Sequence, residues 1–189
     1  MVQVVEIVRF GKNGLQRTER ALPAPGPGQE RVRMGAVSLN YRDLMMVLGL
    51  YNPRQPLPLI PCSDGAGTVV AVGEGVTAWR PGDRVMGAFA QDWLDGDVDR
   101  RCGRRTLGGP LDGMLAEEVI LPETGLVRSP DSLSDAEAAC LPCAGVTAWH
   151  ALVAQGEIKS GDTVLVIVTG GVSLFALQFA RVHGARVIV

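Results

Sequence analysis

A pair of glycines near the end of the sequence has the setting of a phosphate-binding turn. Gly170 and Gly171 follow the uninterrupted apolar run of residues 164–168 and precede a segment with apolar residues at helical spacing. Glycines at a strand-to-helix turn let a pyrophosphate approach the backbone at the positive end of a helix. Val168 and Ser173 occupy the first and third positions of the full three-residue fingerprint. On its own, the turn favours dinucleotide binding no more strongly than a glycine pair kept for packing.

Cysteines and histidines add little to this chemistry. Cys140 and Cys143 form a C-x-x-C pair, which suits redox or metal chemistry, but no second cysteine pair or metal-spaced histidine accompanies it. Buried structural thiols are therefore the favoured interpretation. The two histidines are His150, inside a predicted helix, and His183, whose place at a helix C-terminus is explained by the helix dipole. We assign neither a catalytic role.

The elements that must position such residues change in kind along the chain. The first 130 residues are rich in valine, glycine and proline, and they predict short strands joined by glycine turns, as in a small β barrel or sandwich. A polar, glycine-containing segment at residues 91–111 is expected to form a long surface loop. The predicted strands span residues 2–10, 31–38, 67–72, 84–88 and 114–121.

Helices are predicted from about residue 130 onward. Ser134 and Glu137 have the spacing of a capping box, which predicts a helix over residues 135–141. A second helix is predicted over residues 145–154, ended by Gly156. The last 30 residues then predict a buried strand (164–168), the glycine turn, a helix (174–183) and another strand (185–189). This order is that of the first βαβ unit of a dinucleotide-binding fold.

Composition excludes several classes of partner. The 189 residues carry a formal net charge of −2, so nucleic acid is not an expected partner, because binding phosphates requires a concentrated basic surface. No apolar run is long enough to span a bilayer, and Glu6 and Arg9 interrupt the apolar N-terminus, so neither a membrane span nor a signal peptide is expected. Four cysteines without disulfide-like spacing favour a reducing compartment, and we expect a cytoplasmic protein.

Six short segments form an ordered set that covers nearly the whole chain. They are residues 38–44 (SLNYRDL), 61–67 (PCSDGAG), 79–85 (WRPGDRV), 108–116 (GGPLDGMLA), 143–149 (CAGVTAW) and 170–174 (GGVSL). In this order they resemble the zinc-free, quinone-oxidoreductase-like and alcohol-dehydrogenase-like branch of the medium-chain dehydrogenase/reductase superfamily. The resemblance implies an α/β protein whose first domain is mainly β: a GroES-like β barrel at residues 1–144, followed by an incomplete, truncated Rossmann βαβ unit at residues 145–189.

The resemblance also bears on metal binding. In zinc-dependent members, a Cys-His pair stands where this chain has Asn40 and Tyr41, and a metal-binding histidine stands where it has Ser63. A further cysteine of those members corresponds to Cys143. A single thiolate cannot supply the three protein ligands of a catalytic zinc. The loop that carries four cysteines in the structural zinc lobe holds only Cys102 here, so the resemblance implies that both zinc ions are absent.

Without zinc, the expected substrate is one that accepts hydride readily. The resemblance implies NAD(P)H-dependent reduction of a quinone or of an activated C=C or carbonyl group, with developing charge met by hydrogen-bond donors. NADP is favoured over NAD by the resemblance, although the residue that separates them would fall just past Val189. The implied catalytic residues are Asn40, Tyr41, Asp43 and Tyr51, and the implied cofactor-binding residues are Thr147, Gly170, Gly171, Val172 and Ser173. From the residues alone, Asn40, Tyr41 and Asp43 indicate only a polar helix start, and a tyrosine in a loop after an apolar helix, such as Tyr51, is often a packing residue.

Family members are longer than this chain, so we expect a fragment or a homo-oligomer completed by another chain. Two strands and one helix of a Rossmann sheet would leave apolar faces exposed, including Val164, Val166 and Val187. The alternative function is a truncated, non-catalytic GroES-like domain that dimerises or binds a partner. Cofactor binding separates the two hypotheses, because only the enzyme requires it.

Overall fold

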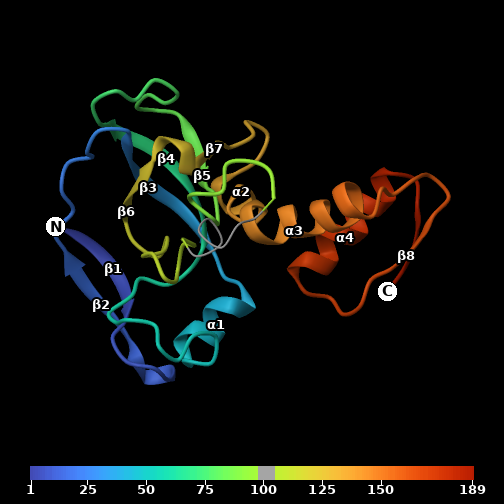
Figure 1. The fold of residues 1–189 in the computed structure, drawn as a ribbon, viewed down its shortest axis with the longest axis horizontal. Coiled ribbons are helices and arrows are strands. Elements are labelled where there is room, and N and C mark those ends of the chain that lie inside the picture. The colour runs from blue at the N-terminus through green and yellow to red at the C-terminus, as the bar shows by residue number, and fades with distance from the viewer. Residues whose placement is uncertain (98–104) are drawn as a thin grey trace. The chain divides into compact units, whose positions relative to one another are not determined.

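The protein divides into two compact units, Met1–Ala139 and Cys140–Val189. The computed structural model describes residues 1–97 and 105–189 (Figure 1). Cys102, which the metal argument above uses, lies outside the described residues. The predicted domain division after residue 144 stays a prediction.

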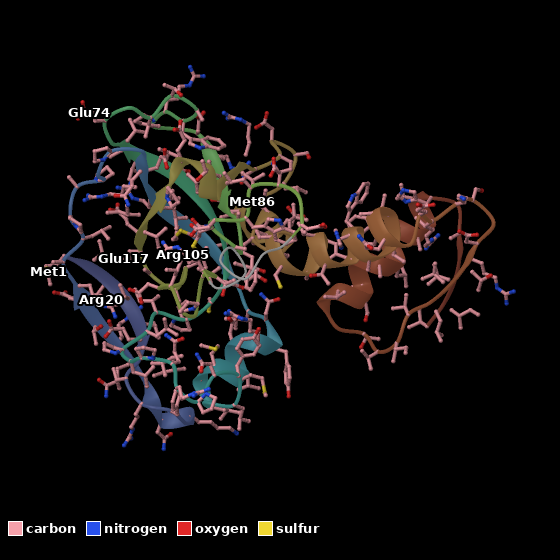
Figure 2. All side chains as sticks on the ribbon, in the orientation of Figure 1. Met1, Arg20, Glu74, Met86, Arg105 and Glu117 are labelled. Carbon is pink, nitrogen blue, oxygen red and sulfur yellow. The ribbon has the colours of Figure 1, made fainter. Side chains whose placement is uncertain are left out.

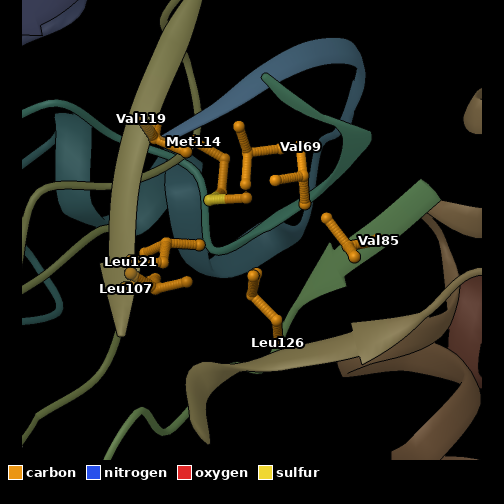
Figure 3. Packing of buried hydrophobic residues seen from close by; sticks show 8 residues of the cluster. Val69, Val85, Leu107, Met114, Val119, Leu121 and Leu126 are labelled. Atoms are coloured by element: carbon orange, nitrogen blue, oxygen red, sulfur yellow. The ribbon is translucent and has the colours of Figure 1, made fainter. Parts of the chain in front are cut away.

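The first unit is built around a five-stranded antiparallel sheet with the strand order β6-β3-β4-β5-β7. Pleat alternation sends every second side chain of these strands to the inner face, where they form one core around Val32, Val69 and Met114 (Figure 3). The mainly β first domain predicted from the sequence is confirmed. The strands are β3 (Gln29–Ser38), β4 (Asp64–Val72), β5 (Arg84–Gly87), β6 (Glu118–Pro122) and β7 (Leu126–Arg128).

A hairpin and a short helix complete the part of this unit that concerns the site. β1 (Val2–Ile7) and β2 (Leu15–Arg20) pair antiparallel, and a 3₁₀ turn η1 (Lys12–Gly14) connects them. The helix α1 (Tyr41–Val47) packs Met46 and Val47 against Ile7 of β1. A second apolar cluster therefore anchors α1 to the hairpin.

An ion pair joins the β1–β2 hairpin to the loop that contains Asp112. Arg20, at the end of β2 (Figure 2), pairs with the buried Glu6 and with Asp112. Asp112 in turn accepts a hydrogen bond from the backbone N–H of Ile60 (2.9 Å). These contacts fix the start of the segment that carries Ser63 and Asp64.

Two strand and loop predictions in this unit were wrong in part. The strand predicted over residues 114–121 begins only at Glu118. Thr106, Leu107 and Gly109 of the predicted surface loop are buried, and Leu107 belongs to the main core. The polar and glycine-rich composition of the segment hid this burial, because Thr106 satisfies its hydroxyl internally by donating to the carbonyl of Gly109 (2.6 Å).

The helix predicted over residues 135–141 is present and capped as expected, but it ends at Ala138. In α2 (Asp135–Ala138), the backbone N–H of Glu137 donates to Ser134 Oγ (3.3 Å), and the backbone N–H of Ser134 donates to Glu137 Oε2 (2.8 Å). This reciprocal pair is a capping box. Arg84 binds the Asp135 carboxylate (2.7 Å) and so joins α2 to β5. Another short element of this unit is η3 (Glu123–Gly125).

The second unit contains a helical segment followed by a βαβ unit. The segment is continuous through η4 (Leu141–Gly145), α3 (Val146–Trp149) and η5 (His150–Gln155). β8 (Thr163–Leu165) and β9 (Arg186–Ile188) pair in parallel, with α4 (Gly171–Val182) between them in the chain. Trp149 packs edge-to-face on Phe179 with ring centroids 5.4 Å apart, which joins α3 to α4.

The exposure expected for the strands of this unit was partly wrong. The strand predicted over residues 164–168 ends at Leu165. Val166, which was expected to be exposed, is buried, whereas Leu165 and Ile167 are 66% and 73% exposed. Because side chains alternate across a strand, burying Val166 turns its neighbours to the opposite face. Within the described residues, no helix is both long and apolar enough to cross a membrane.

Candidate active site and nucleotide-binding turn

Asn40 and Asp43 form the N-terminal cap of α1. The Asp43 carboxylate accepts a hydrogen bond from the backbone N–H of Asn40 (2.8 Å). Asp43 is only 5% exposed, and burial raises the pKa of its carboxyl, although the hydrogen bond from Asn40 acts in the opposite direction. The helix start inferred from these residue types is therefore present, and one of its acids is held inside the protein.

The side chain of Asn40 is aimed at a second buried acid. Asn40 Nδ2 donates to Asp64 Oδ2 (2.9 Å), and Ser63 Oγ donates to Asp64 Oδ1 (3.1 Å). Ser63 and Asp64 are fully buried. We call Asn40, Asp43, Ser63 and Asp64 the Asp64 cluster. It places an amide and a hydroxyl on a buried carboxylate, which is an arrangement that holds donors in fixed orientations.

Close backbone packing holds the segment that carries this cluster. Cys62 has a positive φ of 73°, and its carbonyl accepts a hydrogen bond from the N–H of Met114 (2.8 Å). A Cβ on Gly113 would overlap the carbonyl oxygens of Pro61 and Cys62. Burial, with the charges of Asp43 and Asp64, raises the pKa of Cys62 to about 12, so this thiol is not a nucleophile.

A pocket of about 380 Å³ opens in the same unit. Tyr51, one of the predicted catalytic residues, lines it and is 56% exposed. None of its lining residues carries a formal charge, so the pocket suits a neutral, largely apolar molecule. The lining residues are Met46, Tyr51, Asn52, Gln55, Phe89, Thr106, Gly109 and Pro110.

Arg42, which was not predicted as a site residue, connects α1 to the pocket. Its guanidinium lies 4.9 Å from the ring centroid of Tyr51 and 5.0 Å from that of Phe89. It also donates to the carbonyls of Leu107 (3.1 Å) and Gly109 (2.6 Å). Its neighbours within residues 40–43 were predicted as site residues. The residues that Arg42 contacts, residue 89 and residues 106–109, are distant from it in sequence, so no local pattern predicts these contacts.

In the second unit, the glycine turn precedes α4 as predicted. Gly170 is the N-cap residue of α4, and a Cβ on it would meet nothing within 4 Å. Gly171 is nearly as open, with a Cβ reaching only that of Ala144, at 3.5 Å. Neither glycine has a positive φ. Packing and backbone conformation therefore do not require these glycines, whereas close approach of a ligand to the helix N-terminus would.

The other predicted cofactor residues are in the same unit. Ser173 Oγ donates to the carbonyl of Ile167 (2.9 Å), so its hydroxyl stabilises the turn from within. Val172 and Thr147 are exposed, on α4 and α3 respectively. Val168, at the first position of the fingerprint, has a φ of 65°, a left-handed conformation that a β-branched residue adopts only under strain.

The structure thus divides three of the four predicted catalytic residues between the Asp64 cluster and the pocket, and leaves the fourth outside both. Asn40 and Asp43 lie in the Asp64 cluster, Tyr51 lines the pocket, and Tyr41 is 76% exposed with no hydrogen bond to that cluster. Ser63 and Asp64 were not predicted as catalytic residues, although the segment that contains them, residues 61–67, is one of the six that carry the family resemblance. In the part of the chain that the structure describes, no group of three or more His, Cys, Asp or Glu side chains could hold a metal ion.

The chain matches the model of a known protein family. Residues 26–131 match the family model of the alcohol dehydrogenase GroES-like domain. The chain belongs to this family. The match spans the strands β3 to β7, the α1 helix and the Asp64 cluster, and it confirms the GroES-like fold and the medium-chain dehydrogenase/reductase resemblance.

Individual relatives of this GroES-like chain are oxidoreductases by name. It is 47% identical over 165 residues to a zinc-type alcohol dehydrogenase-like protein of Schizosaccharomyces pombe, covering 86% of this chain and 48% of that one. It is 33% identical to an acryloyl-coenzyme A reductase of Metallosphaera sedula, covering 96% and 56% of the two chains. A quinone oxidoreductase structure from Pseudomonas syringae matches with a TM-score of 0.79 at 32% identity, covering 99% and 52%. The chain therefore spans about half the length of the proteins it matches.

Proposed function

We propose that this protein is part of a zinc-independent, NAD(P)H-dependent oxidoreductase that reduces a quinone or a C=C bond conjugated to a carbonyl. The observation that carries the proposal is the Asp64 cluster. Where zinc-dependent relatives have metal-binding Cys and His, Asn40 and Ser63 donate to a buried carboxylate. Amide and hydroxyl groups are poor zinc ligands, so these donors suit hydrogen bonding to a substrate or to a neighbouring acid.

The pocket supports the proposed substrate class. A reaction without a Lewis acid requires an acceptor that is already activated, and quinones and enones are neutral, flat and mainly apolar. The rings of Tyr51 and Phe89 and the side chain of Met46 supply apolar walls of that kind. The Tyr51 hydroxyl can donate a hydrogen bond to the oxygen on which charge develops.

The glycine turn fits the proposed cofactor. The open space at Gly170 and Gly171 would admit a pyrophosphate, and the first N–H groups of α4 would bind it, with Val172 and Ser173 completing the turn. Thr147 is proposed as a further hydrogen-bond donor to the cofactor. When bound, NAD(P)H supplies hydride. The resemblance favours NADP over NAD.

Cofactor titration tests this proposal. NADPH and NADH are added to the protein while the fluorescence of Trp79, Trp93 and Trp149 is followed, and oxidation of the bound cofactor by 1,4-benzoquinone and by cyclohexenone is then measured. We expect saturable binding and oxidation with at least one acceptor. Absence of binding up to millimolar cofactor would overturn the proposal.

A second candidate is a binding module that associates without catalysis. The exposed apolar side chains of Leu165 and Ile188 on the small parallel sheet, and of Ile167 just after β8, favour it, because such faces are usually covered. A homo-oligomer, or further chain beyond these residues, would cover them. Self-association without any cofactor binding would support this candidate over the enzyme.

A further inference from the structure

Arg42 is a charged residue that contacts the pocket wall. Its guanidinium contacts the rings of Tyr51 and Phe89, and it binds Thr106 Oγ1 (3.3 Å) and the Gly109 carbonyl (2.6 Å). These four partners are half of the residues that line the pocket. A planar guanidinium held by a fork of hydrogen bonds and by two rings is fixed in position in a way that a lysine would not be.

The charge of Arg42 is not cancelled by an acid in the pocket wall. No lining residue carries a formal charge. The next residue along the chain, Asp43, accepts a hydrogen bond from the backbone N–H of Asn40. Burial raises the pKa of its carboxyl, and the charge of Arg42 acts to lower this pKa without a hydrogen bond between the two side chains. The hydrogen-bond partners of the guanidinium are neutral carbonyls and a hydroxyl. A molecule in the pocket therefore lies against rings and carbonyls that the Arg42 guanidinium contacts, with the positive charge of Arg42 next to it.

We propose that Arg42 makes the pocket selective for substrates that become anionic as they react, and that it also positions Tyr51. This inference rests on the proposed function. A quinone or enone accepts hydride at one end of its conjugated system while NAD(P)H is oxidised to NAD(P)⁺. The electron pair moves to the carbonyl oxygen, which is later protonated by water. The anion formed in between is what the Arg42 charge stabilises.

The test uses two probes of one shape and different charge. 4-Nitrophenolate mimics the anion, and 4-nitroanisole is its neutral counterpart; binding of both to the whole chain is measured without cofactor. We expect the wild-type protein to bind the phenolate about tenfold more tightly than the ether, because a fixed charge acts on one probe only. Arg42→Gln should abolish this preference, so that the two probes bind with similar affinity. Arg42→Lys should keep part of the preference.

Controls separate a charge effect from a loss of folding. Arg54→Gln removes an exposed arginine from the same segment as Asn52 and Gln55 and should behave as wild type. Equal affinity of the wild-type protein for the two probes, or no binding of either, would overturn the proposal even if Arg42→Gln fails to fold. In turnover, Arg42→Gln should lower kcat more than it raises KM. Phenolate selectivity without hydride transfer would contradict the proposed function and not the pocket's charge selectivity.

Discussion

Two buried carboxylates of this protein, Asp64 and Glu30, differ in the hydrogen bonds that they accept. Asp64 accepts hydrogen bonds from Asn40 and Ser63. Glu30, in β3, is also fully buried, but neither of its carboxylate oxygens has a hydrogen-bond partner within the described residues. Burial raises the pKa of Glu30 to about 7, and the negative charge of Glu123 adds to this effect. Glu30 therefore holds a proton in the folded state under conditions in which the unfolded chain has lost it.

A pH dependence of stability follows from Glu30. Because its folded-state pKa is raised from 4.5 to about 7, its contribution to stability is complete below pH 4.5 and is lost as pH rises to 7. Glu30→Gln, which resembles the protonated acid, should match wild type at pH 4.5 and exceed its unfolding free energy by about 3 kcal/mol at pH 8. Urea unfolding at several pH values measures both.

The exposed Glu74 provides a matched control (Figure 2). Glu74→Gln should leave the pH profile of unfolding as it is in the wild type. If Glu30→Gln gave no gain at pH 8, the Glu30 carboxylate would not be buried without hydrogen-bond partners, and this explanation would be contradicted.

At the scale of single elements, the turn before α4 contains a strained residue. Val168 has a φ of 65°, and nothing in its side chain offsets this conformation, since the residue is 72% exposed. Val168→Gly should therefore raise the unfolding free energy of the second unit by about 1 kcal/mol, the relief of strain exceeding the added entropy of the unfolded chain. Thermal unfolding followed by Trp149 fluorescence measures this, and a loss of stability would contradict the assigned backbone.

Substitution by alanine should change the stability of the protein little at Gly170, before α4, and much more at Gly113, in the loop that packs against residues 61 and 62. Gly170→Ala should change stability by less than about 0.5 kcal/mol, because a Cβ there meets nothing, but it should weaken NADPH binding at least about tenfold. Gly113→Ala should cost about 3 kcal/mol, because its Cβ would overlap the carbonyls of Pro61 and Cys62. Unchanged NADPH affinity in Gly170→Ala would remove the turn from the cofactor site.

Local signals account for what could be predicted from the sequence. The capping box of Ser134 and Glu137 and the βαβ order around Gly170 depend on residues close together in the chain, and both are present. Burial of Leu107 and the contacts of Arg42 depend on pairing between distant segments. Neither leaves a periodic pattern, so the pocket could not be predicted.

At the scale of the whole chain, the two units differ in their cores. The first buries Ile7, Val32, Val69 and many other aliphatic side chains, whereas the described buried apolar residues of the second are mainly alanines with Val166. Amide hydrogens of β3 and β4 should therefore exchange at least about tenfold more slowly than those of β8 and β9. Equal protection would mean that the units unfold together.

The central claim is that hydrogen-bond donors, and not zinc, serve the chemistry of the Asp64 cluster. The most direct measurement is the rate of NADPH oxidation by a quinone or enone with protein stripped of metal by a chelator, before and after zinc is added. We predict the same rate in both samples, because Asn40 and Ser63 offer no zinc ligands. A rate that vanishes with the chelator and returns in proportion to bound zinc would contradict this account.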